Sequence, residues 1–470
     1  MRKAFYACSP WLVAFAVLLC VTPVYPQKKR PATKPNAGPA AAPASASQVK
    51  FTEHKLKNGL RIYLVEDHSA PVVSISVNYD VGSRNEKKGR TGFAHLFEHM
   101  MFQGSENIGK SEHFILVDTN GGEMNGTTDE ERTIYYETLP ANQLELAVFL
   151  EADRMRSLDI SKENLDNQRN AVQEERRLRL DNQPYGIFFE KLNETIYDDF
   201  AYKHSAIGSM EDLTAASVED VREFFKTYYA PNNAALALVG DFNPTQALTL
   251  IKKYFEPLAA QPKPPAVVIN EPVQNAQRRL KVDDPLAQVP VMILAYKGIR
   301  GNTPDAYAMN VLSTILGGGE SSRLYQKLVK EKQLLIEAQM YSQVRRGIGM
   351  NAIIAVMTPG KKQEEVEAAI NEELAKLQNE PIADWELEKA KQFAKRNAIN
   401  ARQSSLGLAS SIAEAAIAWN DPNLVNTRLA KIAAVTKADV QRVAQQYFKK
   451  ELSTIGIAVP APKGAAKPGE

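Results

Sequence analysis

Hydrophobic residues begin to recur regularly at Phe51, and the first pattern is that of a sheet. Leu60 to Leu64 alternates apolar and polar side chains, which predicts a half-buried strand. Val72 to Tyr79 predicts a second strand, and the apolar run from Ala234 to Val239 predicts a later one. Helical periodicity predicts helices that begin near Gly92, Ser111, Asn142 and Ser161.

The pattern starts again after a proline-rich segment at 261–265, which is typical of a linker. Val289-Pro290-Val291 repeats Ala70-Pro71-Val72. The clearest match joins two helix–strand segments at a constant offset of 219 residues. Its apolar positions are Val221, Tyr228, Tyr229, Leu236 and Leu238, matched by Val440, Tyr447, Phe448, Ile455 and Ile457. These matches predict an internal duplication.

We therefore predict an α+β fold with two homologous domains, at 50–260 and 272–460, joined by a linker at 261–271. Strands cluster and helices follow in groups, so each domain should be a mainly antiparallel sheet packed with helices. The length of 470 residues agrees with about two or three domains at roughly 150 residues each. Residues 461–470 are predicted to be a disordered tail.

The first 27 residues differ from the rest. Arg2 and Lys3 precede an apolar run from Trp11 to Val21, the pattern of a secretory signal peptide. A membrane anchor is the alternative, but this run is too short to span a bilayer comfortably. We expect export to the periplasm or beyond, with no stable transmembrane anchor. Residues 28–48 are rich in Lys, Pro, Ala and Ser and are predicted to be a disordered tether.

Composition limits the chemistry. Both cysteines, Cys8 and Cys20, lie in the leader, so the mature chain would have no disulfide. Any metal must then be bound by histidines and carboxylates. The 57 basic and 55 acidic side chains give a net charge of +2, which offers no support for a nucleic-acid surface.

A candidate metal site lies between Thr91 and Gly104, which we expect to be the N-cap and the C-terminal stop of one helix. His95 and His99 are four residues apart and share a helical face, and Glu98 lies on the same side. Two such imidazoles can bind one zinc ion, and the carboxylate can reach a metal-bound water. This is the H-x-x-E-H order of inverted zincins. The alternative is a pair of satisfied core histidines, but the chain has only six histidines in all.

A catalytic zinc site needs a third protein ligand. On the helix predicted from Ser161, one stripe carries Leu165, Gln168, Ala171, Val172 and Glu175. Glu175 thus points with apolar residues, where an unpaired carboxylate would be costly. Glu174 is rotated about 100° away and is better explained as part of a solvated charge run. We predict Glu175 as the third ligand.

These motifs resemble the pitrilysin/insulinase family, in its shorter branch related to mitochondrial processing peptidases. That family pairs H-x-x-E-H with a glutamate about 76 residues beyond the second histidine, and here 175 − 99 = 76. The resemblance covers about 50–458. Its further matches are Gly121-Gly122 with Asn125, Thr133 to Tyr136, Gly208-Ser209, Gly317-Gly318-Gly319 and Ser321-Ser322-Arg323-Leu324.

The resemblance implies an exported zinc endopeptidase that hydrolyses peptides or unfolded protein segments. His95, His99 and Glu175 would bind one Zn²⁺ per chain, and Glu98 would be the general base. The peptide substrate would add to a sheet edge as an extra strand, near Asn125 to Tyr136.

The chain also departs from the family. Active members carry an Arg and a Tyr, seven residues apart, in the second domain, where Lys330 and Glu337 stand here. A lysine cannot reproduce a guanidinium fork, and an ionised glutamate cannot donate to an oxyanion. Gln168 stands where several relatives have a glutamate.

We therefore expect either a second subunit of the same family that carries the Arg/Tyr pair, or a homodimer. The alternative function is a non-hydrolytic structural or substrate-holding subunit. Gly317–Gly319 is not a phosphate loop, because no Gly-Lys-Ser/Thr follows it. The remaining histidines are expected to be structural or exposed, namely His54, His68, His113 and His204.

Overall fold

The computed structural model describes residues 48–462. The predicted leader at 1–27 with both cysteines, nearly all of the tether at 28–48 and most of the tail at 461–470 lie outside this range. The described residues from Phe51 onward form one compact unit. Among the described residues, no helix has the length and apolar character needed to span a membrane.

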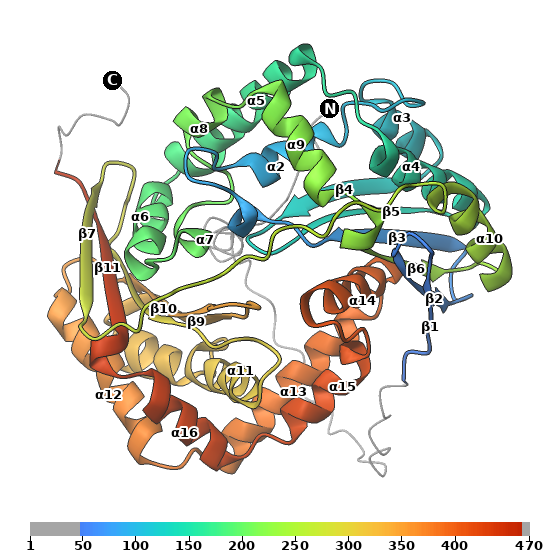
Figure 1. The fold of residues 1–470 in the computed structure, drawn as a ribbon. Coiled ribbons are helices and arrows are strands. Elements are labelled where there is room, and N and C mark those ends of the chain that lie inside the picture. The colour runs from blue at the N-terminus through green and yellow to red at the C-terminus, as the bar shows by residue number, and fades with distance from the viewer. Residues whose placement is uncertain (1–47, 463–470) are drawn as a thin grey trace, which may run out of the picture. The chain divides into compact units, whose positions relative to one another are not determined.

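The first sheet has six strands in the order β1-β2-β6-β3-β5-β4 (Figure 1). β2 and β6 run parallel, and the other neighbours are antiparallel. The strands are β1 (Thr52–Lys55), β2 (Arg61–Glu66), β3 (Val72–Tyr79), β4 (Glu123–Thr128), β5 (Thr133–Pro140) and β6 (Ala234–Gly240).

The second sheet has five strands in the order β7-β11-β8-β10-β9, with only β7 and β11 parallel. The strands are β7 (Arg278–Asp284), β8 (Val291–Lys297), β9 (Leu335–Gln343), β10 (Met350–Met357) and β11 (Ser453–Pro460). Apart from β1, this order repeats that of the first sheet. The predicted α+β class with mainly antiparallel sheets is confirmed.

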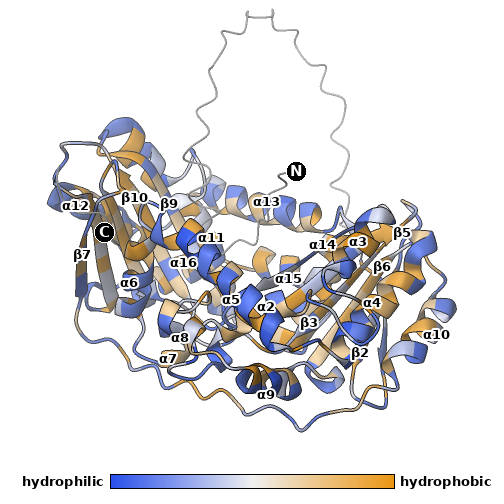
Figure 2. Ribbon diagram, turned by 90° about the horizontal axis from the view of Figure 1, so that it is seen from above, coloured by the Kyte–Doolittle hydropathy of each residue, from blue (hydrophilic) through white to orange (hydrophobic). Residues whose placement is uncertain are grey.

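Helices surround both sheets. In Figure 2 the strands are mainly hydrophobic, whereas the helices around them carry hydrophobic and hydrophilic sides. In the first half they are α2 (Phe93–Met100), α3 (Glu112–Thr119), α4 (Leu144–Arg156), α5 (Lys162–Arg176), α6 (Gly186–Ile196), α7 (Phe200–Lys203), α8 (Met210–Thr214), α9 (Val218–Tyr228) and α10 (Pro244–Phe255). In the second half they are α11 (Pro304–Gly317), α12 (Gln363–Asn379), α13 (Asp384–Ala401), α14 (Ser405–Trp419), α15 (Leu424–Ala433) and α16 (Lys437–Tyr447).

Short helical turns complete the described elements. Four are 3₁₀ turns: η2 (Ser83–Asn85), η3 (Ala141–Gln143), η5 (Pro231–Asn233) and η7 (Lys450–Leu452). Two are π-helical: η4 (Arg177–Asp181), which continues α5, and η6 (Tyr325–Glu331).

The offset of 219 residues extends well beyond the positions that predicted it. Adding 219 to the bounds of α9 gives those of α16, and adding it to the bounds of η5 gives those of η7. The start of α6 maps in the same way onto Ser405, the start of α14. The strands of the first sheet precede the predicted linker at 261–271, and those of the second sheet follow it. The exact domain boundaries, 50–260 and 272–460, stay predictions.

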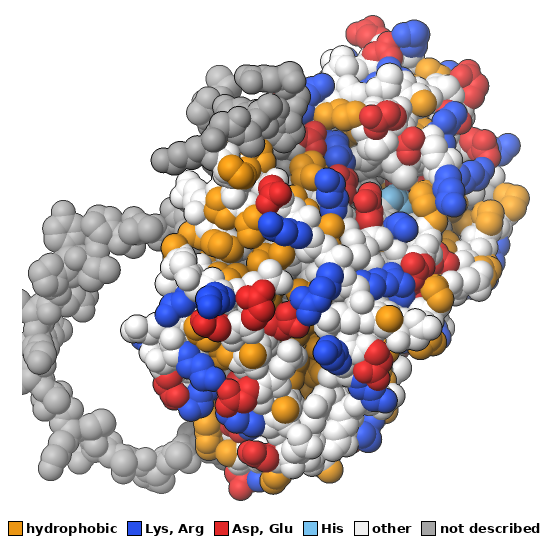
Figure 3. All heavy atoms as spheres, turned by 90° about the vertical axis from the view of Figure 1, so that its left-hand side faces the viewer, with side chains coloured by type: hydrophobic (Ala, Val, Ile, Leu, Met, Phe, Trp, Pro, Cys, Tyr) orange, Lys and Arg blue, Asp and Glu red, His pale blue; other side chains and the backbone are white. Residues whose placement is uncertain are grey.

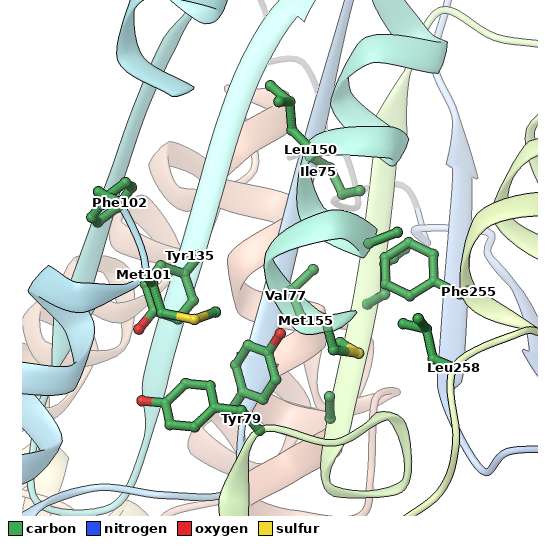
Figure 4. Close-up of a cluster of buried hydrophobic side chains, with 14 of the residues drawn as sticks. Ile75, Val77, Tyr79, Met101, Phe102, Tyr135, Leu150, Met155, Phe255 and Leu258 are labelled. Atoms are coloured by element: carbon green, nitrogen blue, oxygen red, sulfur yellow. The ribbon is translucent and has the colours of Figure 1, made fainter. Parts of the chain in front are cut away.

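Each half has its own hydrophobic core. In the first half, alternate residues of β3 point toward α4, where Ile75, Val77 and Tyr79 meet Leu150 and Met155 (Figure 4). A second core lies between the other sheet and its helices, among them α11, α12 and α16. Surface charges are mixed, and on the face shown in Figure 3 neither sign gathers into a single patch.

The opposite face of the first sheet is covered by α14 of the second half. β3 carries short polar side chains on this face, and Ser74 Oγ lies 2.8 Å from Ser405 Oγ. On β2, Arg61 donates to the carbonyl of Ala416 in α14 over 2.8 Å. Ile62, Tyr63 and Leu64 are all buried, so the strand predicted at 60–64 is covered on both faces rather than half-buried.

The reciprocal contact is made by α6, which packs on β7 and β11 of the second sheet. A Cβ on Gly456 of β11 would lie 2.8 Å from Leu192 Cδ1 and 2.9 Å from Phe188 Cε2, both on α6. The two halves thus exchange one helix each. The small residues on the covered faces allow these helices to approach closely.

Gly456→Ala tests this close approach. The added methyl group should overpack the contact with α6 and destabilise the protein by about 1–3 kcal/mol. In Gly456→Ala/Leu192→Ala, the methyl group fills part of the space that Leu192 leaves, so calorimetry should show a loss of Tm smaller than the sum of the two single losses. Additive losses would mean that α6 and β11 do not share a tight contact.

Candidate metal centre

Helix α2 begins against a tightly packed loop. Its N-cap is Gly92 with a φ of 83°, a left-handed conformation that favours glycine, so the expectation of Thr91 as N-cap is wrong. A Cβ on Gly92 would lie 2.5 Å from the carbonyl oxygen of Ile207. Thr91 instead donates its hydroxyl to Asp212 over 2.6 Å. The helix ends at Met100, earlier than the predicted stop at Gly104.

Three predicted side chains converge between α2 and α5. His99 Nε2 lies 3.2 Å from one carboxylate oxygen of Glu175, and His95 Nε2 lies 3.7 Å from the other. One ligand atom from each of the three lies within 4.8 Å of the other two. Two ligands of a tetrahedral zinc, at bonds of about 2.1 Å, stand about 3.4 Å apart. The spacing and the nitrogen and oxygen donors thus fit a single zinc ion.

Burial and charge set the protonation of these groups. Burial, helped by the charges of His99 and Arg179, lowers the pKa of His95 to about 4. Burial would raise the pKa of Glu175, but the hydrogen bond from His99 and the charges around it lower this pKa to about 2. His95 is therefore neutral and Glu175 ionised near pH 7, the states that bind a metal. Burial lowers the pKa of His99, but Glu175 and Glu98 outweigh it and the net shift is upward.

Glu98 lies on the same side of α2 and is buried. Its Oε2 has no hydrogen-bond partner among the described residues. Burial raises the pKa of Glu98, and contact with the Thr128 hydroxyl opposes that shift. A Cβ on Gly126 would lie 3.1 Å from Glu98 Cγ, so β4 can approach the carboxylate because glycine stands there.

Gln168 and Arg179 surround the centre, and sequence reasoning gave neither a role there. His99 Nδ1 lies 3.3 Å from Gln168 Oε1. This oxygen can accept a hydrogen bond from Nδ1–H, which leaves the Nε2 lone pair for a metal. Arg179 Nη1 lies 2.7 Å from Glu175 Oε1 and shares that carboxylate. The sequence did contain a signal for both residues. Gln168, Glu175 and Arg179 are spaced by seven and four residues, so they lie on one side of a continuous helix.

Strand β4 forms one edge of the first sheet, and among the described residues it pairs only with β5. Asp129 donates its N–H to the Arg132 carbonyl, so the antiparallel alternation turns the backbone groups of Met124, Gly126 and Thr128 away from β5. The predicted substrate edge at Asn125–Tyr136 is thus only partly an edge, because β5 is enclosed between β3 and β4.

Two family descriptions together match most of the described chain. Residues 61–209 match Insulinase (Peptidase family M16), and residues 215–393 match the Peptidase M16 inactive domain. The chain belongs to the insulinase family of peptidases. It is 32% identical to the zinc protease PqqE of Helicobacter pylori, over 85% of this chain and 90% of that protein.

Other members of the insulinase family show the same relationship. A probable mitochondrial-processing peptidase subunit beta of Arabidopsis thaliana is 24% identical, over 88% of this chain and 79% of its own. The crystal structure of a protease from Helicobacter pylori superposes with a TM-score of 0.84 at 31% identity, over 88% of this chain and 100% of that one. The predicted family is thus confirmed, as a metallopeptidase family whose relatives carry the name zinc protease.

The second half of this insulinase-family chain lacks the metal-binding side chains. The offset of 219 places Thr314, Gly318 and Ala394 at the positions of His95, His99 and Glu175, and Gly317 at that of Glu98. This agrees with the description of the matched region as an inactive domain.

The other predicted residues lie away from the three converging side chains. Glu174 is exposed and pairs with Arg177. Lys330 lies on η6 with its ammonium over the Tyr325 ring, and Glu337 lies on β9, where it accepts from Gln339. The remaining histidines have different surroundings. His68 is exposed between two carboxylates, and His54 forms a hydrogen bond with Thr52. His113 is buried beside Phe102, and His204 forms a hydrogen bond with Glu86.

Gln168→Leu should weaken divalent-metal binding by about tenfold or more, because His99 loses the group that orients its ring. Competition with a chromophoric chelator measures the dissociation constant. Gln173→Leu is the matched control, since Gln173 lies on the same helix and bonds Thr214 instead. Equal affinities in the two variants would contradict this role of Gln168.

Proposed function

We propose that the protein is an exported zinc-dependent endopeptidase that hydrolyses bonds in peptides or unfolded protein segments. The observation that carries this proposal is the convergence of His95, His99 and Glu175, with the buried carboxylate of Glu98 beside them. His95, His99 and Glu175 bind one Zn²⁺. Export is proposed from the leader pattern at 1–27, with the periplasm or the exterior as the site of action.

Zinc, when bound, lowers the pKa of a coordinated water and polarises the scissile carbonyl. Glu98 is the general base that accepts the proton of the attacking water and delivers it to the leaving amine. Its apolar surroundings raise its pKa from the ordinary value, which makes it a better proton acceptor. The unpartnered Oε2 is the atom available for this proton.

A substrate peptide would bind by adding a strand to β4. The outward backbone groups of Met124, Gly126 and Thr128 are the hydrogen-bonding positions of this edge. The Gly126 N–H donates to Asn125 Oδ1 over 2.8 Å, and an added strand would replace this local bond. Since Gly126 faces Glu98, a peptide on this edge passes the catalytic carboxylate.

Replacing single side chains separates metal binding from catalysis. Glu98→Gln should retain stoichiometric zinc and the fold but lose hydrolysis by several orders of magnitude, because the amide cannot accept a proton. His95→Ala should lose zinc as well. Metal analysis and cleavage of a quenched fluorescent peptide measure the two effects. Glu174→Gln is the control, since its carboxylate is exposed and pairs with Arg177, and turnover by Glu98→Gln would exclude Glu98 as the base.

We further propose that the active form contains a second subunit of the same family. The motivating observation is that Lys330 and Glu337 occupy the positions where the resemblance implies an Arg and a Tyr. An oxyanion donor contributes about 2.7–4 kcal/mol, so a chain without one is slow by about a hundredfold or more. A homodimer is the simpler alternative. A non-hydrolytic substrate-holding subunit remains the second candidate function, favoured by the same two positions.

Mixing experiments distinguish these arrangements. The isolated chain should cleave peptides slowly, and a related subunit with Arg and Tyr but no H-x-x-E-H should raise its kcat by about a hundredfold. Light scattering and steady-state kinetics follow assembly and activity together. Full activity of the isolated chain, unchanged on mixing, would exclude a required partner. Absence of activity in every mixture despite bound zinc would favour the non-hydrolytic function.

A further inference from the structure

The tip of the β4–β5 hairpin lies at the end of the strand that passes Glu98. Glu130 and Glu131 form this tip, between Asp129 and Arg132. Tight two-residue hairpin loops favour Gly, Asn or Asp, because their turns need positive φ angles. Neither glutamate has a positive φ. The tip therefore lacks the residues that would form a favoured tight turn by themselves.

The Asp129 carboxylate holds the tip from inside. Its Oδ1 accepts the N–H groups of Glu131 over 2.7 Å and Arg132 over 2.9 Å. Arg132 in turn donates to the Thr127 carbonyl and hydroxyl, which connects the tip to the end of β4. These bonds connect the tip to the strand that carries Thr128 and Gly126.

Two consecutive arginines of the second half hold the tip from outside. Arg345 donates to Glu130 Oε1 over 2.5 Å, and its guanidinium is buried with a side-chain exposure of 3%. It also lies 4.8 Å from the Tyr202 ring and donates to the Tyr197 hydroxyl. Arg346 donates from its backbone N–H to Glu131 Oε2 over 2.7 Å and from Nη2 to the Glu131 carbonyl over 2.8 Å.

Glu131 joins the two halves at this point. Its Oε1 accepts from the Tyr202 hydroxyl over 2.5 Å and from Arg84 over 3.0 Å, both in the first half. The N–H of Gly347 approaches the same oxygen at 3.3 Å, and a Cβ on Gly347 would lie 2.1 Å from the Tyr202 hydroxyl. The loop at 345–347 is therefore fitted against the tip by backbone as well as side-chain contacts.

Packing does not hold the tip on its other side. A cavity of about 70 Å³ borders it, lined by Asn78, Gln343, Glu414 and Trp419 together with the tip and the two arginines. Several lining atoms are buried without a hydrogen-bond partner among the described residues, including Asn78 Oδ1, Asn78 Nδ2 and Gln343 Oε1. The bonds from Arg345 and Arg346 are thus the polar contacts that fix the tip relative to the second half.

We propose that Arg345 and Arg346 are positioning residues of the active site, which hold β4 beside Glu98 by fixing Glu130 and Glu131 at the hairpin tip. The inference rests on the proposed peptidase function. It gives the half without metal ligands a defined role in the reaction, because that half sets the position of the strand on which the peptide would bind.

The test compares steady-state kinetics of Arg345→Met, Glu130→Gln and the double variant, all as full-length zinc-loaded protein in the complex that gives activity. Each single variant should lower kcat by about tenfold to a hundredfold and raise KM, since small misplacements at a reacting centre cost this much. Zinc content should remain stoichiometric. The double variant should lose little more than the singles, because both remove one interaction.

Arg323→Met is the matched control. Arg323 forms a two-bond ion pair with the buried Glu386 inside the second half, away from the hairpin. Its loss should lower Tm while leaving kcat unchanged at a temperature where every variant is folded. If Arg345→Met fails to fold, Glu130→Gln and Arg346→Met carry the test, since Glu130 is partly exposed.

The outcomes separate this inference from the proposed function. An inactive wild type with bound zinc would overturn the peptidase function. An active wild type whose Arg345, Glu130 and Arg346 variants keep their kcat and KM, with only Tm lowered, would overturn the positioning role and leave the peptidase intact.

Discussion

The fold depends on one constraint: each sheet has two faces to bury, and its own half covers only one of them. The second face of each sheet carries small side chains, such as Ser74 on β3 and Gly456 on β11. Those faces are covered by α14 and α6, each supplied by the opposite half. A sheet with one uncovered face would expose backbone and apolar surface to water, so the two halves stabilise each other.

The same arrangement explains how a duplicated fold supports a single metal centre. Both halves place a helix at the position of α2, but only the first carries side chains of the candidate metal centre. In the second half, glycines replace Glu98 and His99, and a Cβ on Gly317 would lie 2.1 Å from the Met340 backbone nitrogen. α11 thus packs closely against β9 where α2 leaves room for its side chains. The two copies of the repeat have thus diverged at the positions of the candidate metal ligands.

Much of this could be predicted from the sequence. The duplication was visible because core positions such as Val221 and Val440 keep a constant spacing, and the two sheets follow from it. Helical periodicity placed His95 and His99 on one face of their helix and Glu175 on the apolar stripe of another. The pairing of the two helices was implied by the family resemblance. Contacts between distant segments could not be predicted in this way. The bond of Arg61 to Ala416 on α14, the bond of Gln168 to His99 and the contact of Arg345 with Glu130 depend on tertiary packing.

The exchange of α6 and α14 also bears on how such a chain can arise. A half-length chain with a single repeat would leave one face of its sheet uncovered. Two copies could bury both faces only by donating a helix to each other, as in a domain-swapped symmetric dimer. Fusing two such genes end to end would preserve every contact while freeing the copies to diverge. The present asymmetry between a half with a candidate metal centre and a half without one is the kind of divergence that such a fusion permits.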